Sequence, residues 1–173
     1  GMRESGMPTT AMHVLEPDSA KGADLERAFG VVAHISAGEW LRGADVVVLA
    51  VKPQRAHDAV VAAAAFMATP LVLSIAAGVR GGSLARWLGH ERIVRAMPNT
   101  PALIRKGITG AVALPGVSDA QRADADRILQ SIGTVLWLDD EALLDPVTAI
   151  SGSGPAYVYY FIEALQDAAL DMG

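Results

Sequence analysis

Short apolar runs alternate along this chain with longer stretches in which apolar and polar residues mix at helical spacing. Apolar runs of about four to eight residues bounded by turn residues predict buried strands. Ala44–Val51 is a nearly continuous apolar run, which predicts a strand buried on both faces, as in a parallel sheet. The predicted strands are Met12–Glu16, Val31–His34, Ala44–Val51, Leu71–Ile75, Arg92–Met97, Ile108–Leu114 and Val135–Leu138.

The stretches between these strands have helical periodicity. Asp18 or Ser19 is placed to cap the first helix, and Gly30 is placed to end it. Strands that alternate with helices predict right-handed crossovers and the α/β class, with a doubly wound parallel sheet. The predicted helices cover residues 19–29, 54–67, 82–88, 118–132 and 140–150, with a short helical turn at 37–41.

The last segment, residues 151–173, predicts one long helix after a Ser-Gly turn. Pro155 suits a first helical position, and Ser153 is placed to cap the helix. One apolar ridge follows the spacing of a buried helix face, and a second ridge lies beside it. We expect the chain to supply only one of the two partners, and the other to be missing or to come from a second subunit. The ridges are Val158, Phe161, Ile162, Leu165, Ala169 and Met172, and Tyr157, Tyr160, Ala164 and Ala168.

Composition narrows the function classes. Among 173 residues, 51% are hydrophobic and the net charge is −5, which favours a globular protein and argues against a nucleic-acid binder. No apolar run reaches the ~18 residues of a membrane span, so we expect no membrane partner. The absence of cysteine excludes disulfides and fits the cytoplasm. The four histidines show no ligand spacing, so no metal site is expected; they are His13, His34, His57 and His90.

Candidate chemistry lies where the predicted strands end, because ligands of doubly wound sheets sit at the carboxyl ends of the strands. Glu16 is suited to accept hydrogen bonds from an adenosine ribose, and taken alone its charge favours NAD over NADP; the alternative is a solvated turn carboxylate. Lys52 is suited to a phosphate, a ribose or a substrate carboxylate; the alternative is a lysine that only reaches water.

Two more turns belong to this edge. The mostly small residues Ser74–Gly78 would let a flat ring approach the backbone, although close helix packing would require the same residues. Met97–Pro101 places two prolines around Asn99 and Thr100, which suits either ligand presentation or a rigid turn. No nucleophile with its base and no Gly-rich phosphate loop is recognisable, so any chemistry would come from a bound cofactor.

Four phrases, in this order and at these separations, resemble the pyrroline-5-carboxylate reductase family over Met12–Gly173. The resemblance implies NADPH- or NADH-dependent reduction of the C=N bond of 1-pyrroline-5-carboxylate to L-proline, in proline biosynthesis. It also implies a Rossmann domain, here residues 1–150, and the start of an all-helical dimerisation domain at 151–173. The phrases are Ala44-Asp-Val-Val-Val-Leu-Ala-Val-Lys-Pro-Gln54, Val72-Leu-Ser-Ile-Ala-Ala-Gly-Val79, Ile93-Val-Arg-Ala-Met-Pro-Asn-Thr-Pro-Ala102 and Ile150-Ser-Gly-Ser-Gly-Pro-Ala-Tyr-Val158.

By this resemblance, three groups of residues belong to the site. Glu16–Asp18 flank the adenosine ribose, with Glu16 and Asp18 as the candidate side chains. Met97, Pro98, Asn99 and Thr100 lie near the nicotinamide and the substrate. The remaining cofactor-binding candidates are Ala50, Val51, Lys52, Pro53, Ile75, Ala76 and Ala77.

The chain also departs from the family's pattern. The family's first strand with its Gly-rich turn, and its Pro-Gly-Gly-Thr-Thr loop, have no counterpart here, so the resemblance implies truncation at both ends and an inactive or incomplete form. Loss of a central strand predicts neighbouring strands with unpaired edges. Some family members carry Ser where Glu16 stands, which suits NADP.

Two alternatives remain open. The first is a non-catalytic dinucleotide-fold assembly module that oligomerises through the 155–172 helix without binding a cofactor. The second is another Rossmann reductase, such as a β-hydroxyacid dehydrogenase relative. We rank the second lower because those proteins lack the Ser-Gly-Ser-Gly-Pro-Ala-Tyr phrase at 151–157.

Overall fold

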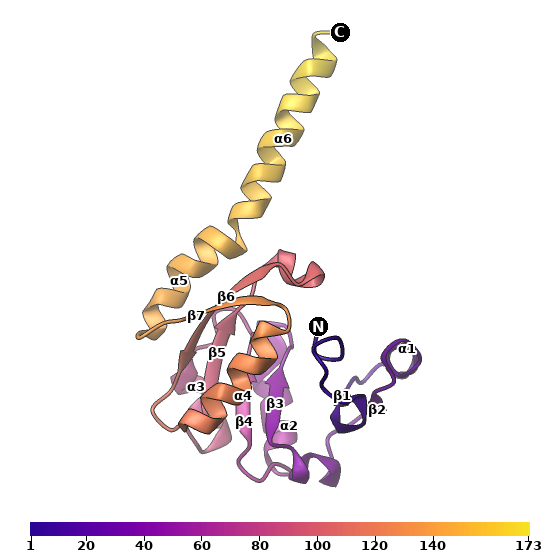
Figure 1. Ribbon diagram of the computed structural model, residues 1–173, viewed down its shortest axis with the longest axis vertical. Helices are drawn as coiled ribbons and strands as arrows, with labels where there is room; N and C mark the ends of the chain where they lie inside the picture. The colour runs from indigo at the N-terminus through magenta and orange to yellow at the C-terminus, as the bar shows by residue number, and fades with distance from the viewer.

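The computed structural model describes all residues, 1–173, and contains two sheets (Figure 1). A two-stranded parallel sheet pairs β1 with β2, and a five-stranded sheet has the order β3-β4-β5-β6-β7. All seven predicted strands are present, within a few residues of their expected ends. The strands are β1 (His13–Leu15), β2 (Val32–His34), β3 (Val46–Leu49), β4 (Leu71–Ser74), β5 (Ile93–Met97), β6 (Gly107–Ala113) and β7 (Gly133–Trp137).

The larger sheet is not wholly parallel. Strands β3, β4 and β5 are parallel to one another, and β6 is parallel to β7, but β5 and β6 are antiparallel. The reason is the connection 98–106, which contains only one 3₁₀ turn. A parallel neighbour needs a crossover of about a dozen residues or more, usually a helix, so this short connection turns the chain back.

The helices alternate with the strands as predicted, and their caps follow the sequence. Asp18 Oδ1 accepts the N–H groups of Ala20 and Lys21, and Gly30 ends the first helix with φ 68°. The second helix is shorter than predicted, since a 3₁₀ turn precedes it and it already ends at Ala64. The helices are α1 (Ser19–Phe29), α2 (Ala56–Ala64), α3 (Gly81–Leu88), α4 (Asp119–Gln130), α5 (Leu144–Val147) and α6 (Gly154–Asp171). Short turns are η1 (Thr9–Ala11), η2 (Glu39–Gly43), η3 (Pro53–Arg55), η4 (Thr100–Ile104), η5 (Glu141–Leu143) and the π-helical η6 (Thr148–Gly152).

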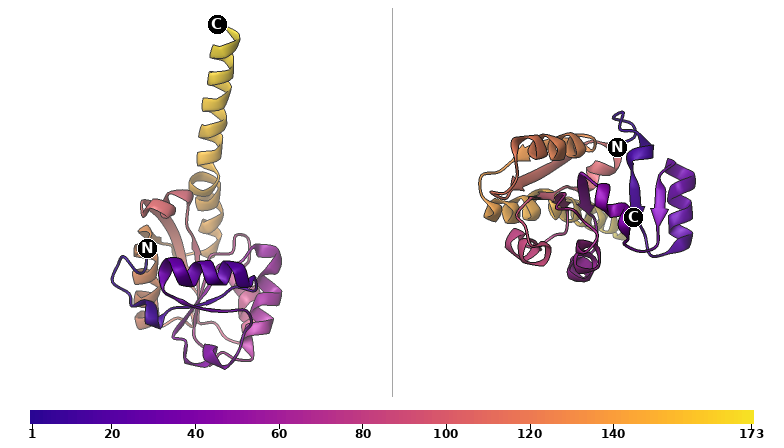
Figure 2. Two further views of the ribbon diagram at one scale, coloured as in Figure 1. Left: turned by 90° about the vertical axis from the view of Figure 1, so that its right-hand side faces the viewer. Right: turned by 90° about the horizontal axis from the view of Figure 1, so that it is seen from below.

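The core has two parts, one on each face of the larger sheet (Figure 2). Val72 faces a cluster that includes residues of α2 and α3, whereas Leu71 and Leu73 face residues of α4. All four residues of β4 are therefore buried, as its apolar run predicted. This three-layer arrangement, with helices on both faces of the sheet, is Rossmann-like and confirms the predicted fold class.

The prediction that Ala44–Val51 is buried on both faces is wrong for β3. Leu49 is buried, but Val48 is 39% exposed. The reason is position, since β3 lies at the edge of the five-stranded sheet and pairs only with β4. Strand β1 likewise pairs only with β2. Strands β1 and β3 therefore each have an unpaired edge, as the missing central strand predicted.

The C-terminal helix departs from two expectations. Ser153 does not cap α6, since its side chain makes no capping hydrogen bond. Residues 151 and 152, predicted as part of a turn, belong to the π-helical η6 that continues α5. The Thr148 and Ser151 hydroxyls donate to the carbonyls of Leu144 and Val147, which keeps the segment helical. Figure 1 shows α6 projecting away from the sheets.

The surroundings of α6 also differ from the prediction. We expected one of its two apolar ridges to find a partner within the chain, but residues 156–173 are all exposed. Nothing in the fold packs along this helix, which projects away from the sheets (Figures 1 and 2). None of the helices combines the length and apolarity that a bilayer crossing requires.

Candidate functional site

The turns after β3, β4 and β5 lie side by side at one edge of the larger sheet. Leu49 is paired with Ser74, and Ser74 is paired with Arg95, so the three parallel strands end at nearly the same level. The three predicted site turns, residues 50–53, 75–77 and 97–100, are thereby brought to a single edge. This is the edge at which doubly wound sheets bind their ligands.

The first turn presents a free cation. Lys52 is exposed and enters none of the ion pairs of the chain. Its carbonyl accepts the N–H of Arg55 at 2.8 Å, and Pro53 occupies the first position of η3. The backbone of Lys52 is thus fixed by the turn, whereas its ammonium group remains available to an anion or a ribose.

The second turn keeps its backbone close to the sheet. The N–H of Ile75 donates to Leu49 O at 3.2 Å, and the N–H of Ala76 donates to the buried Ser74 Oγ at 3.4 Å. Ala77 is exposed, and Gly78 has φ 74°, a conformation that glycine adopts without a steric penalty. Small side chains here leave the backbone open to a flat group.

The third turn is held by its own polar groups. Asn99 Oδ1 accepts the N–H of Ile108 at 2.9 Å, so this amide fixes the start of β6, whereas Thr100 is exposed. The Met97 methyl carbon, Cε, lies only 3.2 Å from the position that a Cβ would take at Gly152. The loop 97–100 and the Ser-Gly segment therefore meet, although they lie far apart in the sequence.

Glu16 and Asp18 lie between β1 and α1, next to the two-stranded sheet, which shares no ladder with the three turns. Both carboxylates are engaged locally. Glu16 Oε1 accepts the N–H of Asp18 at 3.0 Å, and Asp18 caps α1. Each oxygen can accept further hydrogen bonds, so these contacts leave the predicted ribose contact possible.

The edge combines small side chains with a free cation. Ala50, Ala76 and Ala77 are small, and Lys52 is the unpaired cation beside them. The metal-ligating side chains that an ion would need are not clustered at this edge. The arrangement therefore suits a flat nucleotide with anionic groups.

Comparison with known proteins agrees with this geometry. Residues 141–173 match the pyrroline-5-carboxylate reductase dimerisation family, and residues 1–78 match a family described as NADP oxidoreductase, coenzyme F420-dependent. The whole chain is 45% identical to the pyrroline-5-carboxylate reductase of Pseudomonas aeruginosa. The chain belongs to the pyrroline-5-carboxylate reductase family. It spans 64% of the length of that relative.

Solved structures of the family have the same fold. A pyrroline-5-carboxylate reductase from Coxiella burnetii, 35% identical, superposes with a TM-score of 0.89 over 99% of this chain and 65% of its own. The Plasmodium falciparum pyrroline carboxylate reductase, solved with NADP bound, is 30% identical, with a TM-score of 0.82 over 99% of this chain and 63% of its own. Prephenate dehydrogenase from Aquifex aeolicus, 16% identical with a TM-score of 0.72, shares the fold alone; the match covers 99% of this chain and 66% of that chain.

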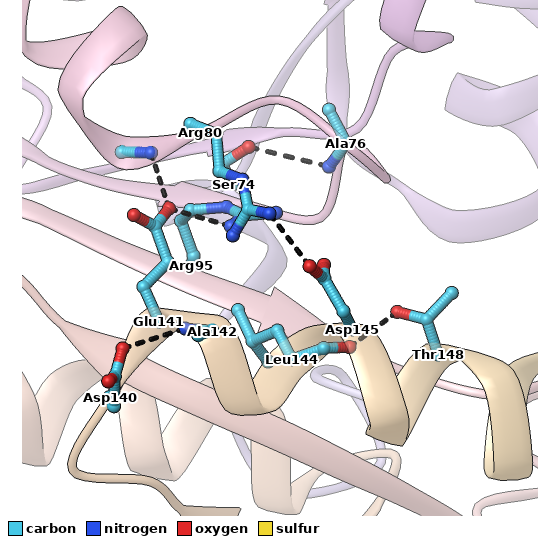
Figure 3. Close-up of polar contacts among 11 residues, drawn as sticks. Ser74, Ala76, Arg80, Arg95, Asp140, Glu141, Ala142, Leu144, Asp145 and Thr148 are labelled. Carbon is cyan, nitrogen blue, oxygen red and sulfur yellow. Dashed lines mark hydrogen bonds and ion pairs between the residues drawn. The ribbon is translucent and has the colours of Figure 1, made fainter.

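One polar cluster of this reductase-family chain was missed by sequence reasoning. Arg95, in the middle of β5, is buried, and its Nη1 donates to Glu141 Oε1 at 2.6 Å (Figure 3). The same oxygen accepts the N–H of Gly81 at 2.6 Å, and Arg80 pairs with Asp145 at 2.7 Å. A charged residue inside an apolar strand was the available signal, because a buried charge needs a partner.

Proposed function

We propose that this chain forms the dinucleotide-binding part of a pyrroline-5-carboxylate reductase, which reduces 1-pyrroline-5-carboxylate to L-proline in proline biosynthesis. The observation that carries the proposal is the 45% identity with the P. aeruginosa reductase along the entire chain. The edge formed by the turns after β3, β4 and β5 supports it, because all three motif-bearing turns meet there.

The chain's own residues would have distinct tasks at this edge. Ala50, Val51, Lys52 and Pro53 would line one side of the cofactor, and the small turn Ile75–Ala77 the other. Met97–Thr100 would border the nicotinamide and the substrate, with Asn99 holding the loop in shape through Ile108. When bound, NADPH supplies the hydride for the C=N bond. The protein binds and orients the cofactor and the substrate, and excludes water from the site.

Cofactor choice depends on Glu16 and its surroundings. The Plasmodium relative was solved with NADP, which supports NADPH for this chain. A carboxylate at the ribose would repel a 2′-phosphate, which supports NADH. We propose that the chain accepts both cofactors, and that the negative charge of Glu16 weakens its preference for NADPH over NADH.

The oligomer follows from α6. We propose that residues 1–150 form the dinucleotide-binding domain, that residues 151–173 begin the dimerisation domain, and that the chain self-associates through the 155–172 helix. The match of residues 141–173 to the dimerisation family and the exposure of every residue from 156 to 173 support this. A cytoplasmic location and the absence of nucleic-acid partners complete the proposal.

The test is NADPH oxidation in the presence of 1-pyrroline-5-carboxylate. Two proteins are compared: the 173-residue chain, and a chimera in which this chain replaces the corresponding part of the P. aeruginosa reductase. We expect turnover by the chimera and none by the chain alone. In the chimera, Lys52→Ala should raise the KM for NADPH roughly tenfold, the effect of one charge-assisted hydrogen bond. Arg86→Ala, which removes an exposed charge from α3, is the matched control and should leave the KM unchanged.

The outcomes separate the two functions. A chimera that folds and oligomerises but neither oxidises NADPH nor binds it would reject the reductase proposal and favour the non-catalytic assembly module. The long exposed apolar helix is the observation that favours that module. Dinucleotide binding by the 173-residue chain itself would reject the module.

A further inference from the structure

The base of α6 is tied to the candidate cofactor turn by charged side chains. Glu141 lies in η5, immediately before the helical stretch that becomes α6, and its Oε1 accepts hydrogen bonds from Arg95 and from the N–H of Gly81 (Figure 3). Gly81 is the first residue of α3 and ends the segment 74–81, which contains the small-residue turn and links β4 to α3. One carboxylate oxygen therefore bridges two parts of the chain that are far apart in sequence.

This bridge is partly shielded from water, more so at Arg95 than at Glu141. The Arg95 side chain is 7% exposed and the Glu141 side chain 29%, whereas the neighbouring pair Arg80–Asp145 is 50% and 61% exposed. A shielded ion pair loses far more when one partner is removed, because the remaining charge is left without compensation. Exposed pairs contribute little. The inner pair should therefore carry the connection, and the outer pair should add little.

Close packing makes the connection stiff. Leu144 is buried, and Val147 Cγ1 lies 3.0 Å from the position that a Cβ would take at Gly110 in β6. Helix α5 therefore packs directly on the sheet. The π-helical segment that follows contacts Met97 at Gly152. Because α5, η6 and α6 are continuous helical backbone, an element fixed at its base also fixes the direction in which α6 leaves the domain.

We propose that Glu141 is a positioning residue that couples the turn 74–81 to the base of α6, so that dinucleotide binding and association through α6 influence each other. This inference rests on the proposed function in naming the ligand of the turn. The coupling itself is a property of the chain and can be measured without any ligand. Glu141 acts through Gly81 and Arg95 and need not touch a cofactor.

The test is hydrogen–deuterium exchange of the 173-residue chain carrying Glu141→Ala, with residues 119–130 of α4 as the internal reference. We expect exchange in both 74–81 and 141–152 to become roughly tenfold to hundredfold faster, the range for losing a hydrogen bond to a charged group. Exchange in α4 should stay unchanged. Asp124→Asn, which breaks the exposed pair of Asp124 with Arg127 on α4, is the control and should leave both segments unchanged.

Two further variants keep the proposal falsifiable if Glu141→Ala fails to fold. Glu141→Gln retains an oxygen that can accept the Gly81 N–H, so it should restore protection of 74–81 to near the wild-type value while leaving Arg95 without a countercharge. Asp145→Asn should change exchange in either segment by less than about threefold, because its ion pair is exposed. Acceleration in only one of the two segments in Glu141→Ala, or equal acceleration throughout the chain in Glu141→Gln, would overturn the coupling.

A second experiment, which measures hydrogen–deuterium exchange with NADPH present, separates this inference from the proposed function. NADPH titrated into the wild-type chimera should slow exchange in 141–152 as well as in 74–81, and Glu141→Gln should weaken the slowing in 141–152. If NADPH does not bind to the chimera, the proposed function fails, while the ligand-free exchange result still stands on its own. If NADPH protects 74–81 alone, the coupling is refuted and the proposed function is retained.

Discussion

Two adjacent leucines at the base of α6 provide a matched measurement of how α5 is held on the sheet. Leu144 is 2% exposed, whereas Leu143 is 45% exposed. The two share residue type and are adjacent in the chain, at the junction of η5 and α5. Replacing each by alanine therefore isolates burial as the variable. The comparison tests whether Leu144 docks this helix.

The structure sets the expected size of the effect. Truncating a fully buried leucine to alanine costs about 2–2.5 kcal/mol in transfer free energy, at about 0.8 kcal/mol per methylene-sized group. The cavity left behind adds about 1–2 kcal/mol, because the tightly packed strand opposite, at Gly110, allows only partial collapse. Leu144→Ala should therefore lower the free energy of unfolding by about 3–4.5 kcal/mol. Leu143→Ala should cost about 1 kcal/mol, since about half of its surface is already in water.

The assay is urea denaturation followed by far-ultraviolet circular dichroism and by tryptophan fluorescence. Trp137 is a useful reporter because its Nε1–H donates to Asp126 Oδ1 at 2.8 Å, which joins β7 to α4. A lower midpoint at an unchanged slope reports a loss of stability. If Leu143→Ala costs as much as Leu144→Ala, or if Leu144→Ala costs less than about 1 kcal/mol, the proposed docking of α5 is refuted.

Three further predictions follow from single side chains. Ser118→Ala removes the capping box with Gln121 and should cost about 1 kcal/mol in urea denaturation; an unchanged midpoint would contradict the cap. Burial and, to a lesser degree, Arg92 lower the pKa of His90, so the unfolded chain binds the proton more readily and stability should fall as pH drops from neutral through that pKa. His90→Asn should flatten this pH dependence, and an unaltered slope would argue against it. Glu16→Ser in the chimera should raise affinity for NADPH relative to NADH in fluorescence titrations, and an unchanged ratio would exclude the proposed selectivity.

Local signals identified most of the fold. Strands and helices follow from apolar runs and helical periodicity, and caps such as Asp18 and Gly30 act over a few neighbouring residues. The sequence also pointed to the turns 50–53, 75–77 and 97–100 as candidate ligand-binding elements. That they would share one edge could be inferred from the alternation of strands and helices, because parallel strands present their carboxyl ends together.

Non-local partners determined the rest. The antiparallel β6, the partial exposure of Val48 on the edge strand β3, and the exposure of α6 all depend on which elements lie beside each other. The continuation of the helix through the Ser-Gly phrase, by contrast, has a local cause, because the hydroxyls of Thr148 and Ser151 donate to carbonyls four residues earlier.

The sequence alone thus determined the secondary structure, the family and the turns of the candidate site, since these depend on residues close together in the chain. Only the tertiary structure revealed that Glu141 meets Arg95 and Gly81, and that Gly152 meets Met97. No local pattern marks such pairs, because the partners are many residues apart and only the packing of α5 on the sheet brings them within contact distance.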